Sequence, residues 1–221
     1  MSRIAIIGGH GKVALHLARQ LSERGDEVTS IFRNPDHEAD VSQTGATPLV
    51  LDIEQADVES LVQVLQGHDA VVWSAGAGGG NPERTNAVDR DAAMASMDAA
   101  AKAGVYRYVM VSYRGAGKDE IPSDNPFSTY ADAKAAADAH LRASGLQWTI
   151  VAPGGLDLEP GAGTIHLDRN YDRAHDRTSV SREDVASVVA AVLTDERTIG
   201  STYEFVGGST PINEALGIVS H

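Results

Sequence analysis

The chain has 221 residues, which is enough for one substantial hydrophobic core but short for two domains of ordinary size. Its formal net charge of -13 would repel nucleic-acid phosphates and anionic membrane surfaces, so neither is an expected partner. The absence of cysteine excludes disulfides, thiolate catalysis and cysteine-ligated metals. Small molecules are therefore the expected ligands.

The N-terminal residues run directly into a strand-like segment, Ile4-Ala5-Ile6-Ile7, and do not resemble a signal peptide. No apolar run approaches the roughly 20 residues that are needed to span a bilayer. We therefore expect a cytoplasmic protein without a membrane segment.

Short runs rich in valine and isoleucine alternate with longer stretches of helical periodicity. In chain order these patterns predict a strand at 4–7, a helix at 12–24, strands at 27–32 and 48–51, a helix at 57–65, a strand at 70–73, a helix at 85–103, a strand at 106–111, a helix at 130–143 and a strand at 148–151. Strands that are apolar on both faces and alternate with helices are typical of a parallel sheet covered on both sides. The sequence therefore predicts an α/β fold with a doubly wound parallel sheet.

The alternation lapses after residue 153 and resumes weakly with a helix at 182–193 and a strand at 203–206. We expect a single domain over 1–221, with its core at about 1–152 and a small C-terminal cap and sheet edge at about 153–221. Because such sheets bind ligands at the carboxyl ends of their strands, we expect the cap to close a pocket there.

The segment between the first strand and the first helix reads Gly8-Gly9-His10-Gly11-Lys12-Val13-Ala14. A small residue at the strand exit allows a tight turn, Gly11 lets the backbone approach a pyrophosphate, and Ala14 lets the helix pack against the strand. We expect this loop to bind a dinucleotide, with His10 contributing its backbone N–H. Lys12 either adds positive charge beside the ligand or is simply exposed in the first helical turn.

The second strand ends with Ile31-Phe32-Arg33-Asn34, which places an arginine and no carboxylate at a selective position. A carboxylate there accepts hydrogen bonds from the ribose 2′-hydroxyl of NAD, whereas an arginine accommodates the 2′-phosphate of NADP. The sequence therefore favours NADP(H) over NAD(H).

Asp52 and Ile53 follow the third predicted strand. We expect Asp52 to accept a hydrogen bond from the adenine amino group while Ile53 packs beside the ring. The alternative for Asp52 is a capping residue of the next helix.

Short motifs follow one another along the chain, namely Gly8-x-x-Gly11-x-x-Ala14, Asp52-Ile53, Ser74-Ala75-Gly76, Val111-Ser112, Tyr130-x-x-x-Lys134 and Val151-Ala152-Pro153-Gly154. In this order they resemble the short-chain dehydrogenases/reductases, and more closely the atypical branch with biliverdin reductase B/flavin reductase-like and NmrA-like members. The stretches 143–154 and 181–186 support that branch. The resemblance implies a Rossmann fold over nearly the whole chain and adds Ala75, Gly76 and Pro153 to the expected cofactor contacts.

The reaction of the family is carried over onto Tyr130, Lys134 and Ser112. Tyr130 and Lys134 lie one turn apart on one helix face, so the ammonium can lower the pKa of the phenol while it also binds the nicotinamide ribose. The resemblance implies that Tyr130 passes a proton to or from a substrate oxygen that Ser112 hydrogen-bonds. A tyrosine and a lysine at this spacing also arise by chance, and the long loop between Ser112 and Tyr130 leaves open whether both reach one oxygen.

One polar segment is crowded with histidines and aspartates, but arginines interleave them and their spacing matches no metal motif. These residues are His166, Asp168, Asp172, His175 and Asp176. We expect no metal site.

The leading hypothesis is an NADP(H)-dependent oxidoreductase that acts on a small carbonyl, quinone or flavin-like acceptor, because the Tyr130 and Lys134 pair is intact. The alternative is a non-catalytic NADP(H)-binding sensor of the NmrA-like kind, which would not need that pair. A nucleotide-sugar epimerase or dehydratase ranks third, because the segment after Val151 is short for the large substrate domain of such enzymes.

Overall fold

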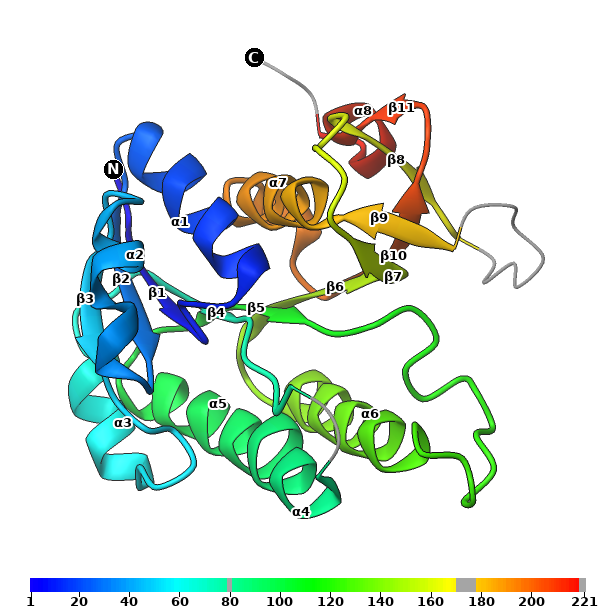
Figure 1. Cartoon of the computed structure of the whole chain (residues 1–221). Helices are drawn as coiled ribbons and strands as arrows, with labels where there is room; N and C mark the ends of the chain where they lie inside the picture. Colours follow the sequence, from blue (N-terminus) through cyan, green and yellow to red (C-terminus); the bar gives the residue numbers. More distant parts are fainter. Residues whose placement is uncertain (79–80, 170–177, 219–221) are drawn as a thin grey trace.

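The computed structural model describes residues 1–78, 81–169 and 178–218 (Figure 1). The strands are β1 (Arg3–Ile7), β2 (Glu27–Phe32), β3 (Thr47–Val50), β4 (Ala70–Trp73), β5 (Arg107–Val111), β6 (Gln147–Pro153), β7 (Gly155–Asp157), β8 (Thr164–Leu167), β9 (Ser179–Ser181), β10 (Ser201–Gly207) and β11 (Thr210–Pro211). The α-helices are α1 (Lys12–Glu23), α2 (Glu38–Ser42), α3 (Val58–Leu65), α4 (Pro82–Thr85), α5 (Ala93–Lys102), α6 (Ser128–Ala143), α7 (Arg182–Leu193) and α8 (Ile212–Leu216). Other helical turns are the 3-10 segments η1 (Pro35–His37) and η3 (Glu196–Thr198) and the π-helical segment η2 (Asn86–Ala92).

Within the described residues, a nine-stranded sheet has the order β11-β8-β10-β6-β5-β4-β1-β2-β3. The run from β3 to β10 is parallel, and β8 and β11 pair antiparallel at one edge. The strand order reverses between β1 and β4, so the connections that follow these two strands diverge and leave a crevice between them. This topology confirms the predicted doubly wound parallel sheet in a single domain.

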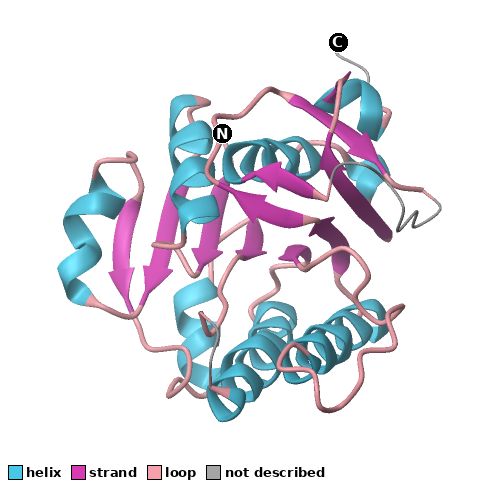
Figure 2. Ribbon diagram, turned by 45° about the vertical axis from the view of Figure 1, so that its right-hand side comes forward, coloured by secondary structure: helices cyan, strands magenta, loops and turns pink. Residues whose placement is uncertain are grey.

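Helices cover both faces of the sheet. Helices α1 and α7 pack together on one face, and α3, α5 and α6 lie on the other (Figure 1). Figure 2 shows the same two layers from a second direction, with the sheet between them.

The side chains of β1 show why this strand is apolar throughout. Ile4 and Ile6 belong to the core that includes α1 and α7, whereas Ala5 and Ile7 belong to the core that includes α3 and α5. All four are at most 1% exposed. A strand that is buried on both faces has no position for a polar side chain, which explains the uninterrupted apolar run in the sequence.

The helix predicted at 85–103 is longer and less regular than expected. It starts with α4 at Pro82, where the Asn81 side chain accepts a hydrogen bond from the Arg84 backbone N–H, and it passes through η2 before α5. An N-cap asparagine followed by proline at the first helical position is a start signal that the predicted boundary missed. The helical turn that precedes the predicted start contains Arg84.

The other differences concern short elements. Local sequence patterns did not predict η1 and α2, the pair of β7 and β9, or the edge elements β8, β11 and α8. The small β7–β9 sheet and the antiparallel edge form by pairing with distant segments, so local periodicity contains no signal for them. Strand β10 is longer than the predicted 203–206 because it is paired on both sides, with β6 and β8.

Arg107 at the start of β5 joins several of these elements. Its Nη1 donates to the carbonyl of Gln147 at 2.8 Å and to the hydroxyl of Thr149 at 2.9 Å. Its Nη2 donates to the carbonyl of Val192 at 2.7 Å and to the hydroxyl of Thr198 at 3.1 Å. Burial lowers the pKa of this guanidinium to about 10. The cost of burying its charge is thus offset by hydrogen bonds that tie β6, α7 and η3 to β5.

Replacing this guanidinium should destabilise the fold. We expect Arg107→Ala to lower the free energy of unfolding by about 2–4 kcal/mol, because it removes the hydrogen bonds that join β5 to β6, α7 and η3. Urea denaturation followed by circular dichroism measures the change. Arg90→Ala is the control, since Arg90 forms an exposed pair with Asp91 and its loss should cost less than about 0.5 kcal/mol. Equal losses in the two variants would contradict the prediction.

Candidate functional site

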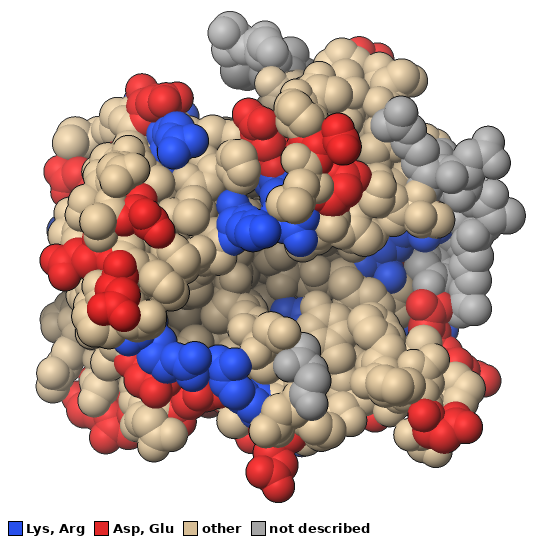
Figure 3. Space-filling model, in the orientation of Figure 1, with Lys and Arg blue, Asp and Glu red and all other residues tan. Residues whose placement is uncertain are grey.

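A cleft lies at the carboxyl ends of β1 and β4 and consists of two adjoining cavities. The smaller cavity has a volume of about 280 Å³ and is bounded by residues that follow β2 and β3. The larger cavity has a volume of about 850 Å³ and is bounded by the loop before α6 and the start of α6. The two share Gly11 and the segment Ser74–Gly76. Figure 3 shows the hollow with lysines and arginines along its rim, although the chain is acidic as a whole.

The glycine-rich loop between β1 and α1 is held in close contact with its surroundings. The backbone N–H groups of Gly8 and Gly9 donate to the carbonyl of Ile31 at 3.0 and 2.8 Å. Gly8 has a φ of +86°, and a Cβ there would lie 2.5 Å from the Cα of Ala75. A Cβ on Gly9 would lie 2.6 Å from that of Ser30. Glycine is therefore required at both positions for the tight turn.

The start of α1 offers a place for an anion. Gly11 precedes the helix, and within the described part of the chain no side chain caps its first turn. Lys12 and Val13 line the larger cavity at this helix end. Uncapped N–H groups and the positive end of the helix dipole are suited to a phosphate, so the residues present fit the predicted pyrophosphate site.

The predicted loop residues divide into two groups. Those that line the cleft are Gly8, His10, Gly11, Lys12 and Val13, together with Ala75 and Gly76 from the segment after β4. Gly9 and Ala14 lie behind them in the interior, where Ala14 is fully buried in the core that includes α1. Pro153 is not among the lining residues of either cavity, because it pairs with Phe205 inside the sheet and its carbonyl accepts the N–H of Arg114.

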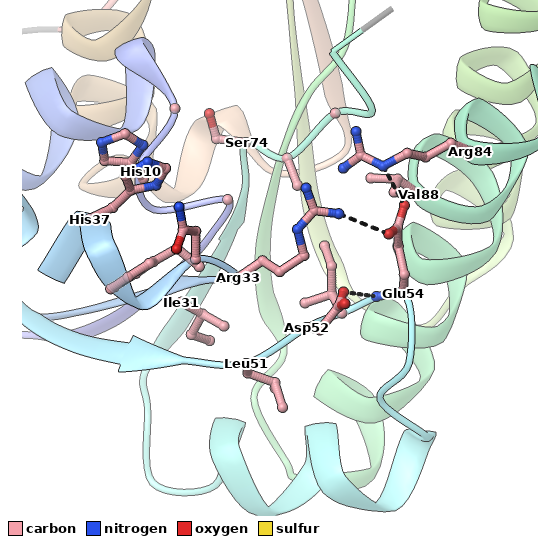
Figure 4. A pocket seen from close by; sticks show the side chains of 17 residues that line it. His10, Ile31, Arg33, His37, Leu51, Asp52, Glu54, Ser74, Arg84 and Val88 are labelled. Atoms are coloured by element: carbon pink, nitrogen blue, oxygen red, sulfur yellow. Dashed lines mark hydrogen bonds and ion pairs between the residues drawn. The ribbon is translucent and has the colours of Figure 1, made fainter. Parts of the chain in front are cut away.

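Two arginines and one carboxylate meet beside the smaller cavity (Figure 4). Nη1 of Arg33 lies 3.1 Å from Oε2 of Glu54, and Nε of Arg84 lies 2.8 Å from Oε1 of the same carboxylate. The Arg33 side chain is 52% exposed, whereas that of Glu54 is only 15% exposed. Both oxygens of Glu54 are thus engaged by guanidinium groups.

The structure removes one of the two roles considered for Asp52. Asp57, not Asp52, caps α3, and its side chain accepts the N–H of Ser60 at 2.8 Å. The Asp52 carboxylate accepts the N–H of Glu54 at 3.1 Å and lines the smaller cavity together with Ile53. The capping alternative is therefore wrong, and the position of Asp52 suits a contact with adenine.

The predicted catalytic side chains Ser112, Tyr130 and Lys134 all line the larger cavity. Lys134 is only 1% exposed, and its Nζ donates to the carbonyl of Val111 at 2.8 Å. The hydroxyl of Ser112 donates to Oδ2 of Asp138 at 2.7 Å. The long loop before α6 therefore does not separate Ser112 from the cavity that Tyr130 and Lys134 share.

The electrostatics of this group differ from the expectation. Burial raises the pKa of Tyr130, and the nearby carboxylates of Asp89 and Asp138 raise it further. Burial lowers the pKa of Lys134, although the same two carboxylates oppose that shift. The predicted lowering of the phenol pKa by Lys134 is wrong in this structure, because burial and the neighbouring carboxylates determine the direction.

Two buried carboxylates complete the group. Asp89 in η2 accepts the N–H of Ala77 at 3.0 Å, while the Arg84 guanidinium donates to the carbonyl of Ala77. Burial raises the pKa of both Asp89 and Asp138. These two aspartates, with Glu54 and Arg84, are the functional candidates that the sequence analysis missed. One of them, Asp138, could have been found from its spacing. It follows Lys134 by four residues and therefore lies on the same face of α6.

The larger cavity also has an apolar part. Phe127 and Leu156 line it and are 42% and 39% exposed, which is high for large apolar side chains. The rings of Tyr113 and Phe127 lie 5.3 Å apart, and those of Phe127 and Tyr130 lie 5.2 Å apart. A ligand with an apolar or planar body can therefore be accommodated beside Tyr130.

The histidines and aspartates of the crowded polar segment can be placed only in part. Asp168 forms an ion pair with Arg114, and Asp172, His175 and Asp176 lie outside the described residues. Across 1–78, 81–169 and 178–218, no three histidine, aspartate or glutamate side chains come together as metal ligands. No helix in these same ranges is both long and apolar enough to cross a membrane.

Comparisons with known proteins agree with this geometry. A family model described as NAD(P)H-binding matches residues 8–196. The uncharacterised sugar epimerase YhfK of Bacillus subtilis is 33% identical over 216 residues, covering 97% of this chain and 98% of that protein.

Solved structures of other proteins are also similar to this chain. A candidate NAD-dependent epimerase/dehydratase of Bacillus halodurans is 31% identical with a TM-score of 0.88, and 99% of each chain is covered. The oxidoreductase ylbE of Lactococcus lactis is 28% identical with a TM-score of 0.85, covering 97% of this chain and 95% of that one. Because the family model matches most of the chain and the relatives match it nearly from end to end, this chain belongs to the NAD(P)H-binding family of Rossmann-fold proteins.

Proposed function

We propose that this protein is an NADP(H)-dependent oxidoreductase of the short-chain dehydrogenase/reductase type, acting on a small carbonyl, quinone or flavin-like acceptor. One observation carries the proposal. Ser112, Tyr130 and Lys134 line a cavity that opens directly from the glycine-rich loop at the start of α1. A dinucleotide has two halves joined by a pyrophosphate, and the cleft offers one cavity on each side of that loop.

The preference for NADP(H) rests on Arg33. Its side chain is half exposed, and one of its five N–H donors is engaged by Glu54, so others remain for a 2′-phosphate. A ribose 2′-hydroxyl would instead need a free carboxylate. Glu54 is not free, because Arg33 and Arg84 occupy its two oxygens.

NADP(H), when bound, supplies or accepts the hydride. A phenol is protonated at neutral pH and the raised pKa of Tyr130 extends this to higher pH, so its hydroxyl is available as a proton donor to the oxygen of an acceptor. The hydroxyl of Ser112 donates its proton to Asp138, so in this arrangement Ser112 can accept a hydrogen bond from a ligand but has no proton left for an acceptor oxygen. The protonated phenol of Tyr130 is therefore the group that favours the reduction of an acceptor.

Two other functions need to be distinguished from this one. The names of YhfK and of the Bacillus halodurans protein favour an epimerase or dehydratase. Such an enzyme would convert its substrate without net consumption of NADPH, which product analysis detects. A sensor would bind the dinucleotide tightly and turn over no acceptor.

The cofactor preference gives the first prediction. We expect NADPH to bind at least about 10-fold more tightly than NADH, and Arg33→Ala to weaken NADPH binding by about 10-fold or more, because charge-assisted hydrogen bonds are lost. The affinity for NADH should change by less than about 3-fold. Nicotinamide fluorescence titration measures both, with Arg90→Ala as the exposed arginine control. Equal affinities of the wild type for NADPH and NADH would overturn the role of Arg33.

The phenol gives the second prediction. Tyr130→Phe should lower the turnover of a carbonyl or quinone acceptor by about 10²–10⁴-fold, because it removes a proton donor, and should leave the Kd for NADPH unchanged. NADPH oxidation with quinones, flavins and aldehydes measures the rate. Tyr106→Phe is the matched control, since Tyr106 is exposed and lies outside both cavities. Unchanged turnover in Tyr130→Phe would remove the phenol from the mechanism.

The pH dependence follows from the raised pKa of Tyr130. The reduction needs the protonated phenol, so its rate at saturating NADPH should stay constant from about pH 6 to pH 9. The reverse oxidation needs the phenolate and should become faster as the pH rises. Single-turnover rates in both directions test this. A reduction rate that falls with a midpoint below about pH 9 would show that the phenol pKa is not raised in the working enzyme.

A further inference from the structure

A buried carboxyl group lies directly behind Ser112. Asp138 comes from α6 and is only 1% exposed, and its Oδ2 lies 2.7 Å from the hydroxyl oxygen of Ser112. Ser112 follows β5 and lines the larger cavity together with Tyr130, whereas Asp138 is not among the described residues that line it. The contact therefore joins a hydroxyl that faces the cavity to a titratable group behind the cavity wall.

The two carboxyl oxygens of Asp138 have different surroundings. Within the described part of the chain, Oδ1 is buried without a hydrogen-bond partner, so the bond with Ser112 is the only one that this side chain makes. An ionised carboxylate has about four lone-pair sites to satisfy, and burying it with one hydrogen bond is costly. A neutral carboxylic acid carries no full charge and needs one acceptor for its O–H, which the oxygen of Ser112 can provide. The geometry thus suits the protonated form of Asp138.

The charged groups around Asp138 act in both directions. Burial raises the pKa of Asp138, and the Glu204 carboxylate raises it further, while Lys134, the hydrogen bond with Ser112 and Arg142 lower it. Lys134 and Arg142 lie on α6 itself, and Glu204 faces a third cavity, of about 700 Å³, which Asp138 also lines. The remaining charged or titratable groups around that cavity or near Asp138 on α6 are Tyr113, Lys118, Tyr130, Asp168, Arg169 and Tyr203.

The direction of the hydrogen bond depends on which group carries the proton. When Asp138 is ionised, it can only accept, and the hydroxyl of Ser112 is spent on it. When Asp138 is protonated, its own O–H donates to the oxygen of Ser112, and the hydroxyl hydrogen of Ser112 can rotate toward the cavity. The separation of 2.7 Å is ordinary for an O–H···O hydrogen bond in either direction.

We propose that Asp138 is a positioning residue which, as the neutral acid, donates to Ser112 and thereby frees the Ser112 hydroxyl to donate to the oxygen of the acceptor beside Tyr130. The inference rests on the proposed reductase function and explains how Ser112 becomes a donor. Asp138 keeps its proton throughout, and Tyr130 supplies the proton that the acceptor gains with the hydride. The second donor stabilises the negative charge that develops on the acceptor oxygen.

Infrared difference spectroscopy tests the protonation state without any acceptor. We expect the C=O stretching band of a buried carboxylic acid to be present at neutral pH in the wild type and missing in Asp138→Asn. Asp132→Asn is the matched control and should keep the band, because Asp132 is exposed on the same helix and lines none of the three cavities. A band from Asp89 is common to all three proteins and cancels in the difference. Identical acid bands in all three would overturn the proposal.

A double-mutant cycle tests whether Asp138 acts through Ser112. Asp138→Leu should lower the turnover of NADPH-dependent reduction by about 10-fold or more and leave the Kd for NADPH unchanged. In the Ser112→Ala background the same substitution should change turnover by less than about 2-fold. Asp138→Asn should stay within about 3-fold of the wild type, because its amide N–H also donates to Ser112. A merely structural role would lower turnover equally in both backgrounds.

The outcomes separate the two proposals. If acceptors are reduced but Asp138→Leu acts equally with and without Ser112, the role of Asp138 is overturned and the reductase function stands. If Asp138→Leu does not fold by circular dichroism, Asp138→Asn still decides, since a folded Asn variant with a loss of about 10²-fold would show that the ionised carboxylate is required. If the wild type reduces no acceptor, the proposed function fails, and the infrared band alone decides whether Asp138 leaves the Ser112 hydroxyl free to donate.

Discussion

The backbone N–H groups of Gly8 and Gly9 both donate to the carbonyl of Ile31, and this fastens the loop after β1 to the end of β2. The positive φ of Gly8 then places the loop against Ala75 at the end of β4, so closely that no Cβ fits between them. This turn lies where the strand order of the sheet reverses, and α1 begins directly after it. The helix N-terminus and the cavities on either side of the loop all depend on this position.

A second constraint acts beneath the larger cavity, where Lys134 is buried near Asp89 and Asp138. Isolated buried charges are costly, and here each group has an opposite charge nearby and at least one hydrogen bond. Each bond also fixes a lining element. Lys134 binds the carbonyl at the end of β5, Asp138 orients Ser112, and Asp89 holds the backbone after β4. Perturbed titratable groups of this kind are typical of catalytic sites.

The distribution of charge reconciles an acidic chain with an anionic ligand. The rim of the cleft bears lysines and arginines (Figure 3), although the formal net charge of the chain is -13. Inside the smaller cavity, Glu54 holds Arg33 and Arg84 close together, although the two guanidiniums would otherwise repel each other. A preorganised cleft with cationic groups of this kind attracts a phosphorylated cofactor even though the net charge of the chain is negative.

The sequence alone determined what depends on local spacing. The glycine-rich loop between a buried strand and a helix, and Tyr130 with Lys134 on one helical face, follow from residues close together in the chain. Only the tertiary structure decided which distant side chains meet, such as Glu54 with Arg84 or Ser112 with Asp138. The same holds for the edge strands, which exist through their partners, and for the raised pKa of the phenol. Burial and long-range pairing are properties of the folded packing, and local periodicity does not encode them.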